Sequence, residues 1–283
     1  MSWIGTHRYW LARRSVQVGI LLLFWLGAQL GLGVLTGNLS AARVLRTIPL
    51  ADPYAVLQIL ATGQWVAGTV LTGAAIILLF YSLFAGRAFC SWVCPVNLLG
   101  DFSHWVKQRW EVQGQFRVRR STRYWIMLLA LPVSAVTGVA AFEWLSPISM
   151  IHRELIFGPG LGLLVILGIV LLDVFVVEHG WCGSLCPLGA FYSVVTSKAL
   201  VRIGFDAGRC DHCGECVQVC PEQQVIDFKQ MSQKGFIDSG ECTNCTRCLE
   251  ICPRDAYHHT LRLMRGPVQD FEEGEHHATQ SAA

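Results

Sequence analysis

The spacing of eight cysteines near the C-terminal end constrains this chain more than any other feature. One run reads C-D-H-C-G-E-C-V-Q-V-C-P from Cys210 to Pro221, and a second reads C-T-N-C-T-R-C-L-E-I-C-P from Cys242 to Pro253. Both runs have the bacterial iron–sulfur spacing C-x2-C-x2-C-x3-C-P, in which the fourth cysteine binds the other cluster. We therefore predict two [4Fe–4S] clusters, the first on Cys210, Cys213, Cys216 and Cys252 and the second on Cys242, Cys245, Cys248 and Cys220.

Two other uses of these cysteines fit the pattern less well. Zinc sites usually pair two C-x2-C knuckles rather than two four-cysteine runs that each end in proline. A disulfide scaffold is typical of short secreted chains, whereas the 12 cysteines here are grouped in closely spaced motifs of a 283-residue apolar chain. Cluster assembly needs reduced thiols, so we expect the motifs to face the cytoplasm.

The composition indicates a membrane protein with a smaller polar domain. Hydrophobic residues make up 53% of the chain and charged residues only 15%, where a soluble domain has about a quarter. A net charge of +2 gives no footprint for nucleic acid. No glycine-rich nucleotide-binding loop is evident either.

Four apolar segments predict four transmembrane helices, because each is close to the length that spans a bilayer. They cover residues 16–35, 64–85, 124–144 and 160–177, and residues 36–63 and 146–159 connect them. Residues 95–110 and 188–200 have apolar side chains at helical spacing and are expected to lie in the membrane interface.

The lysine and arginine distribution predicts the orientation. Three arginines precede the first span and seven basic residues lie from Arg87 to Arg123, whereas the two outer loops carry only Arg43, Arg46 and Arg153. Basic residues favour the cytoplasmic side. Four spans then place both termini, both C-x3-C-P motifs and the cluster motifs in the cytoplasm.

The expected fold is an α-helical membrane bundle followed by a small α+β two-[4Fe–4S] ferredoxin domain. The bundle covers residues 1–200, the ferredoxin domain residues 201–268, and a disordered tail residues 269–283. The bundle divides into two pseudo-repeats, each with two spans, a C-x3-C-P motif and an amphipathic helix. A repeat axis along the membrane normal would bring together Cys90, Cys94, Cys182 and Cys186.

These four cysteines leave several chemistries open. The prolines suit the first turn of the following helices, which would make Cys94 and Cys186 N-caps, where the helix dipole favours a thiolate. Four such groups could bind a further iron–sulfur cluster, zinc or copper, or act as redox thiols. The alternative is that they are buried structural cysteines.

Two acidic residues of the fourth span are candidate proton acceptors for a quinol, since charge within a membrane is usually functional. These are Asp173 and Glu178; on a continuous helix Asp173 would face away from Cys182, whereas Glu178 would share its face. No histidine lies within a predicted span, and His104, His152 and His179 form no obvious pair, so no haem is expected.

The combination of four spans, two C-x3-C-P motifs and a C-terminal dicluster region resembles the NapH family. These are ferredoxin-type quinol dehydrogenase membrane components of periplasmic nitrate reductase systems. The T-G-N-L-S of residues 36–40 and the D-P-Y of residues 52–54 contribute to the resemblance. It implies oxidation of membrane quinol and electron delivery through a NapG-type ferredoxin subunit to a tetrahaem cytochrome or nitrate reductase. Paired C-x3-C-P motifs also occur in NosR-type and CcoG-type proteins, so the alternative is a redox assembly or maturation factor for a respiratory metalloenzyme.

Overall fold

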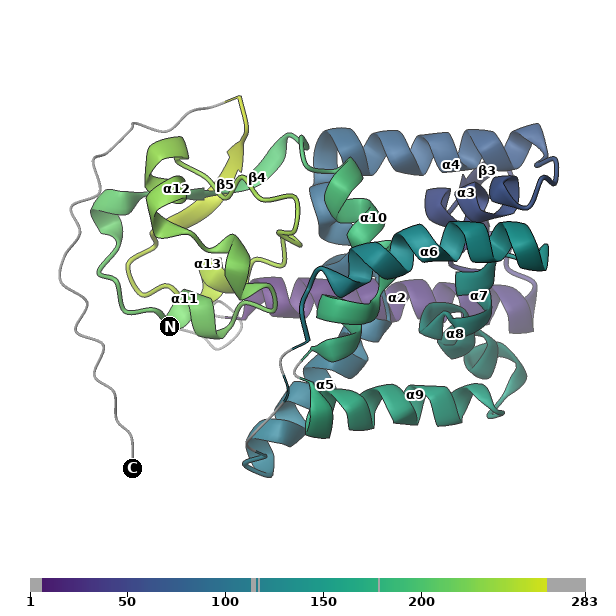
Figure 1. The fold of residues 1–283 in the computed structure, drawn as a ribbon, viewed down its shortest axis with the longest axis horizontal. Coiled ribbons are helices and arrows are strands. Elements are labelled where there is room, and N and C mark those ends of the chain that lie inside the picture. Colours follow the sequence, from purple (N-terminus) through teal and green to yellow (C-terminus); the bar gives the residue numbers. More distant parts are fainter. Residues whose placement is uncertain (1–6, 113–115, 117, 178, 264–283) are drawn as a thin grey trace.

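The chain forms a bundle of long helices with a smaller lobe at one end. In the computed structural model, residues 7–112, 116, 118–177 and 179–263 are described. Figure 1 shows the long helices side by side and the lobe of short helices and two strands against their ends. The expected tail at residues 269–283 lies outside the described residues.

Among the residues that the structure describes, two helices are long and apolar enough to cross a membrane. The first is α2 (Arg8–Leu30), and the second runs from Gly68 to Val93. The second comprises α4 (Gly68–Phe80), the π-helical turn η1 (Tyr81–Ala85), the 3-10 turn η2 (Gly86–Ala88) and the π-helical turn η3 (Phe89–Val93). Two shorter apolar helices are α6 (Thr122–Thr137) and α9 (Gly162–Leu171), which continues into the π-helical turn η4 (Leu172–Val176).

The helix predicted for residues 124–144 is shorter than expected. Gly138 adopts φ +72° and ends α6, and a separate short helix, α7 (Ala141–Leu145), follows. Glycine at a left-handed position is a common helix stop, but the apolar sequence continues through it. The predicted connection at residues 146–159 is also wrong, because it contains α8 (Pro147–Phe157), which begins with proline at its first position.

The segment between the first two spans is structured rather than a simple connection. Three short strands form an antiparallel sheet in the order β1 (Leu35–Gly37), β2 (Ala41–Val44) and β3 (Ile48–Ala51). The helix α3 (Pro53–Ala61) follows, and the Asp52 side chain caps it by accepting a hydrogen bond from the Tyr54 backbone N–H. Asp before Pro at the first helical position is a strong start signal.

The two predicted interfacial helices have different environments. In α5 (Val96–Arg109) the large apolar side chains are exposed, with Phe102 at 52% and Trp105 at 59%. By contrast, Leu188, Ala190 and Tyr192 of α10 (Pro187–Val195) are buried. The expectation of an interfacial position is therefore wrong for α10, which packs against α6 inside the protein.

The C-terminal lobe is built on two antiparallel strands, β4 (Val201–Phe205) and β5 (Tyr257–Leu261). Ile203, Met231 and Ala256 are at its core. Its helices are α11 (Glu215–Gln218), α12 (Phe228–Lys234) and α13 (Arg247–Ile251), with single 3-10 turns η6 (Ala207–Arg209) and η7 (Gln223–Val225). The start of α2 reaches this lobe, where the backbone N–H of Trp10 donates to Glu250 at 2.8 Å.

Candidate iron–sulfur and membrane cysteine sites

The lobe brings four cysteines from both sequence runs around one cavity. Its lining includes Cys220 of the first run and Cys242, Cys245 and Cys248 of the second. Cys220 is the fourth cysteine of the first run, which the spacing predicts to bind the cluster of the second run. The antiparallel pair β4–β5 and the helices α11 and α13 hold the two runs side by side.

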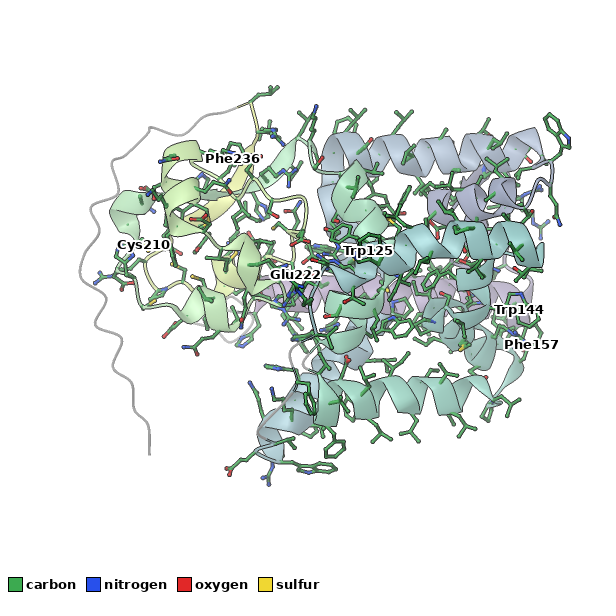
Figure 2. The ribbon with its side chains drawn as sticks, in the orientation of Figure 1. Trp125, Trp144, Phe157, Cys210, Glu222 and Phe236 are labelled. Carbon is green, nitrogen blue, oxygen red and sulfur yellow. The ribbon has the colours of Figure 1, made fainter. Side chains whose placement is uncertain are left out.

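The other four cysteines are Cys210, Cys213, Cys216 and Cys252; Cys216 belongs to the core of the lobe, Cys210 and Cys252 pack against that core, and Figure 2 shows Cys210 at the side of the lobe away from the bundle. The Tyr257 hydroxyl donates to the Cys216 sulfur at 3.2 Å, and the Ala256 N–H donates to the Cys252 sulfur at 3.4 Å. Burial raises the pKa of the Cys210 and Cys216 thiols, and the neighbouring Cys252 adds to the effect. Two sets of four thiols with hydrogen-bond donors to sulfur fit [4Fe–4S] clusters, whose positive charge would hold the thiols ionised.

The four C-x3-C-P cysteines meet at the junction of the bundle and the lobe. The turn η3 and the π-helical turn η5 (Trp181–Leu185) bring Cys90, Cys94, Cys182 and Cys186 to the lining of one cavity of about 50 Å³. Cys245 of the lobe lines the same cavity. Among the described residues, no three His, Cys, Asp or Glu side chains converge closely enough to bind a single metal ion.

The environment of these thiols differs from the one expected at helix N-termini. Cys186 is the N-cap of α10, as predicted, but Cys94 lies one residue before the N-cap of α5, which is Pro95. Burial raises the pKa of Cys186 to about 11 and that of Cys94 and Cys182 well above the usual value. Desolvation therefore outweighs the helix dipole, and ionised thiols here would need a bound positive charge.

The acidic candidates of the fourth span have partly different positions from those predicted. Asp173 lies in the turn η4, and its Oδ1 accepts a hydrogen bond from the Trp181 N–H at 3.1 Å. Asp173 therefore lies near Cys182 rather than facing away from it, because the helix ends at Val176 and His179 adopts φ +50°. Glu178 lies outside the described residues.

The flanking histidines include one pair that the sequence did not reveal. The rings of His104 and His179 stack at 5.5 Å, although 75 positions separate them along the chain. His152 is buried in α8 and contacts Phe24 edge-on at 5.0 Å. The absence of haem stays a prediction.

A buried ion-pair network fixes the lobe to the bundle, and the sequence reading did not single it out. Glu222, the residue after Cys220-Pro221, accepts from Arg87 at 2.8 Å and from Arg123 at 2.7 Å, and it also pairs with Arg120. Arg87 and Arg123 are 2% and 0% exposed. Figure 2 shows Glu222 at the boundary between lobe and bundle. Burial opposes ionisation of Glu222, yet the three guanidinium groups hold its pKa below the usual range.

A second carboxylate extends this network to the other cysteine run. Glu241, which precedes Cys242, pairs with Arg123 and accepts from the Tyr124 hydroxyl at 2.6 Å. Gln224 donates to both Glu222 and Glu241 at 2.7 Å. Although burial favours the neutral form, these donors lower the pKa of Glu241 to about 2. The residues that flank Cys220 and Cys242 are therefore held by the bundle.

Residues inside the first C-x3-C-P motif also contact the lobe directly. The Ser91 hydroxyl donates to the Thr243 carbonyl at 2.7 Å, and the Trp92 indole N–H donates to the Asn244 carbonyl at 3.0 Å. Thr243 and Asn244 are the two residues between Cys242 and Cys245. Adjacency to the motif cysteines was the available sequence signal for these residues and for Glu222 and Glu241.

A larger, mainly apolar cavity of about 270 Å³ lies inside the bundle. Phe89, Ile148 and Leu188 line both this cavity and the cysteine cavity, so the two are neighbours. Its polar lining includes Ser40, Asp52 and Glu143. The sequence reading had not proposed a role for any of these three residues.

Fold and sites together define a mainly helical protein with apolar helices and a dicluster iron–sulfur region. A family profile described as "4Fe-4S binding domain" matches residues 66–113 and again 159–204, and one described as "4Fe-4S dicluster domain" matches residues 202–253. The two matches of the first profile each contain one C-x3-C-P motif.

Curated relatives identify the family. The chain is 42% identical over 226 residues to the methylamine utilization ferredoxin-type protein MauN of Paracoccus denitrificans, with 80% of each chain covered. It is 41% identical over 226 residues to the ferredoxin-type protein NapH of Escherichia coli, with 80% of this chain and 79% of NapH covered. The chain belongs to the NapH/MauN family of ferredoxin-type proteins and is an iron–sulfur electron-transfer protein. Similarity to MauN is as high as to NapH, so the family is as expected but the nitrate system is not singled out. No solved structure matches the chain.

Proposed function

We propose that this protein takes electrons from membrane quinol and passes them through its dicluster domain to a NapG-type ferredoxin partner. A tetrahaem cytochrome or a periplasmic nitrate reductase would then receive them. The observation that carries the proposal is the order of three sites. The apolar cavity shares Phe89, Ile148 and Leu188 with the cysteine cavity, and the cysteine cavity shares Cys245 with the lobe.

In this proposal the two cysteine sets of the lobe each hold one [4Fe–4S] cluster. Cys220, Cys242, Cys245 and Cys248 would hold the cluster nearer the bundle, and Cys210, Cys213, Cys216 and Cys252 the outer one. When bound, such clusters exchange single electrons, at potentials tuned by hydrogen bonds to sulfur and by exposure. The buried network of Glu222 and Glu241 would keep the inner set at a fixed position against the bundle.

The four C-x3-C-P cysteines are proposed to hold a further iron–sulfur cluster between the quinol and the lobe. Their position around one common cavity supports this proposal, and a bound, positively charged group would ionise the buried thiols. If these four cysteines are instead redox thiols or buried structural residues, the protein contains only the iron of the two lobe clusters.

All four apolar helices are proposed to cross a bacterial inner membrane, with both termini in the cytoplasm. α6 and α9 are short, but they run in roughly the same direction as α2 and α4 in the view of Figure 1. The 16 residues of α6 span about 24 Å, and a short hydrophobic span can be accommodated by local thinning of the bilayer.

A redox assembly factor is the second candidate. The chain is about as similar to MauN as to NapH, and the name of MauN refers to methylamine utilization rather than to nitrate. The similarity therefore does not single out electron transfer to nitrate reductase, and this second candidate is kept. Such a factor would reduce or protect a metal centre in its partner, and deletion of its gene would leave that enzyme without cofactor. An electron-transfer subunit would instead leave a cofactor-loaded enzyme that receives no electrons.

The test is quinol-dependent reduction of the purified protein with its partner in lipid nanodiscs. We expect short-chain quinols to give the electron paramagnetic resonance signal of reduced clusters, and no signal would contradict quinol oxidation.

Iron analysis tests the further cluster: we expect about twelve irons per chain, falling to about eight in the double variant Cys90→Ser with Cys182→Ser. Ser184→Ala, within the second motif, is the matched control and should keep all the iron. A wild-type value near eight would contradict the further cluster.

A further inference from the structure

The lining of the apolar cavity includes Ser40, Asp52, Glu143 and Ser146, and two short sequence motifs supply the first two. Ser40 ends the T-G-N-L-S of residues 36–40, and Asp52 begins the D-P-Y of residues 52–54. The Asp52 N–H donates to the Ser40 carbonyl at 2.8 Å, so the two motifs lie side by side. Glu143 of α7 and the following Ser146 supply the other two.

The carboxylates of this lining are held in different ways. The hydroxyls of Ser40 and Ser149 both donate to Oε2 of Glu143, at 2.9 and 3.0 Å. Asp52 uses Oδ1 to cap α3. Burial raises the pKa of Asp52 to about 7, with a contribution from the nearby Glu143 and against the opposing Tyr54 N–H. A carboxylate with a pKa near neutrality can accept a proton and release it again.

Aromatic side chains also line this cavity, and one of them, Phe89, lines the cysteine cavity as well. The rings of Phe89 and Tyr192 stack at 5.4 Å, and Tyr81 contacts Tyr192 edge-on at 5.4 Å. Phe89 directly precedes Cys90 and also lines the cysteine cavity. A molecule in the apolar cavity would thus lie beside the carboxylates and next to the cavity of the C-x3-C-P cysteines.

The size and lining favour a ring with two hydroxyl groups and an apolar tail. The volume of about 270 Å³ is near the lower end of the ~300–1,000 Å³ typical of small-molecule sites. Half-buried Ile20, Leu35 and Leu50 line it, and they give it an apolar side from which a lipid-soluble tail could leave. Two acidic groups with no basic residue in the lining disfavour an anionic ligand.

We propose that this cavity is the quinol-binding site and that Asp52 accepts a proton from the quinol as it is oxidised. The proposal rests on the proposed function, since it requires quinol as the electron donor. It adds the location of the site and the group that accepts the proton.

Oxidation of a quinol to a quinone must account for two protons and two electrons. Both O–H bonds break and both ring C–O bonds become carbonyls, which releases two protons and two electrons. One proton passes to the Asp52 carboxylate and the other to the Glu143 carboxylate. The electrons pass to two one-electron iron–sulfur acceptors, which are reduced by one electron each.

Asp52→Asn tests the proton role, because asparagine caps a helix as well as aspartate does but cannot accept the proton. We expect quinol-dependent cluster reduction by decylubiquinol or menadiol to slow about 100-fold. Reduction by dithionite, thermal stability and the dissociation constant of the oxidised quinone should stay within about threefold. Asp227→Asn is the matched control, since Asp227 caps α12 in the lobe by accepting from Gln230, and its rate should be unchanged.

Occupancy of the cavity is tested separately with a photoreactive azidoquinone and peptide mapping. We expect labelling of residues 36–54 or of α7 in the wild type, and loss of labelling in Ala42→Phe, which fills the cavity. Ala41→Phe is the control, because Ala41 is exposed on the same strand and does not line the cavity.

The outcomes separate the site from the function. If the wild type shows no quinol-dependent reduction, the proposed function fails. If the wild type is reduced but Asp52→Asn reacts at the normal rate, the proton role is overturned. Labelling elsewhere, or labelling that Ala42→Phe leaves unchanged, overturns the site while quinol oxidation stands.

Discussion

At the scale of single residues, Glu222 joins the lobe to the bundle through three ion pairs. It is 5% exposed and pairs with Arg87, Arg123 and Arg120. Removal of one partner from a buried ion pair leaves the remaining charge uncompensated, and this lowers the free energy of unfolding by about 3–5 kcal/mol. The arginines that indicate membrane orientation in the sequence therefore have a second role in docking the lobe.

We predict that Glu222→Gln lowers the free energy of unfolding in detergent by about 3–5 kcal/mol, measured by chemical denaturation. Asp206→Asn is the control, because Asp206 pairs with Arg209 at the surface, where their side chains are 38% and 61% exposed. An exposed pair contributes less than about 1 kcal/mol, and asparagine keeps the helix cap. Equal destabilisation by both substitutions would contradict the docking role of Glu222.

At the scale of elements, α10 connects the two parts of the molecule. It is buried on most sides, its Tyr192 lines the apolar cavity, and Cys186 occupies its N-cap position. Its C-terminal end packs against the loop before Cys242, where Gly240 lies against the Ser193 carbonyl. One short helix thus lines the apolar cavity, lies next to the C-x3-C-P cysteines and contacts the lobe.

Gly240→Ala is predicted to disturb this contact. Its Cβ would overlap the Ser193 carbonyl oxygen and lie 3.0 Å from the Cα of Ser197, both of them backbone atoms that cannot rotate away. We expect a loss of about 1–3 kcal/mol in stability and faster protease cleavage near residue 200. Gly19→Ala in α2 has nothing within 4 Å of its Cβ and should be neutral. Unchanged thermal unfolding of Gly240→Ala would show that the loop shifts without cost.

At the scale of the whole molecule, the start of α2 and the lobe lie at the same end of the bundle (Figure 1). Asp101 of α5 pairs with both Arg14 of α2 and Arg247 of α13, which ties the three together. The β1–β3 sheet packs against α4 at its other end, away from the lobe. A molecule inserted in a membrane along its long helices would therefore present the lobe on one side and the sheet on the other.

Reporter fusions test this arrangement. A fluorescent protein that folds only in the cytoplasm should be active after residue 283, and alkaline phosphatase should be active when inserted at the exposed turn of Leu45 and Arg46. Lysine and arginine bias favours this orientation. An active phosphatase at the C-terminus would contradict it, and equal activity at both sites would contradict a spanning bundle.

The sequence predicts the features that depend on local spacing. The ferredoxin-type runs, the approximate position of the four apolar helices and the N-cap position of Cys186 in α10 all follow from spacing and start signals. The break at Gly138, the helix α8 and the β1–β3 sheet were missed. The apolar sequence continues through Gly138 and into α8, so it does not mark where one helix ends. The strands β1–β3 are only three or four residues long, too short to give a clear alternating pattern.

The sequence by itself determined the family and the chemistry available, because metal-ligand spacing and long apolar runs are properties of neighbouring residues. Only the tertiary structure decided which distant groups meet. Glu222 with Arg123, Asp52 with Glu143, and Asp173 with Cys182 are brought together by chain reversals that no local pattern specifies. Burial is also a tertiary property, so the high pKa of the membrane thiols and the near-neutral pKa of Asp52 follow from packing rather than from residue type.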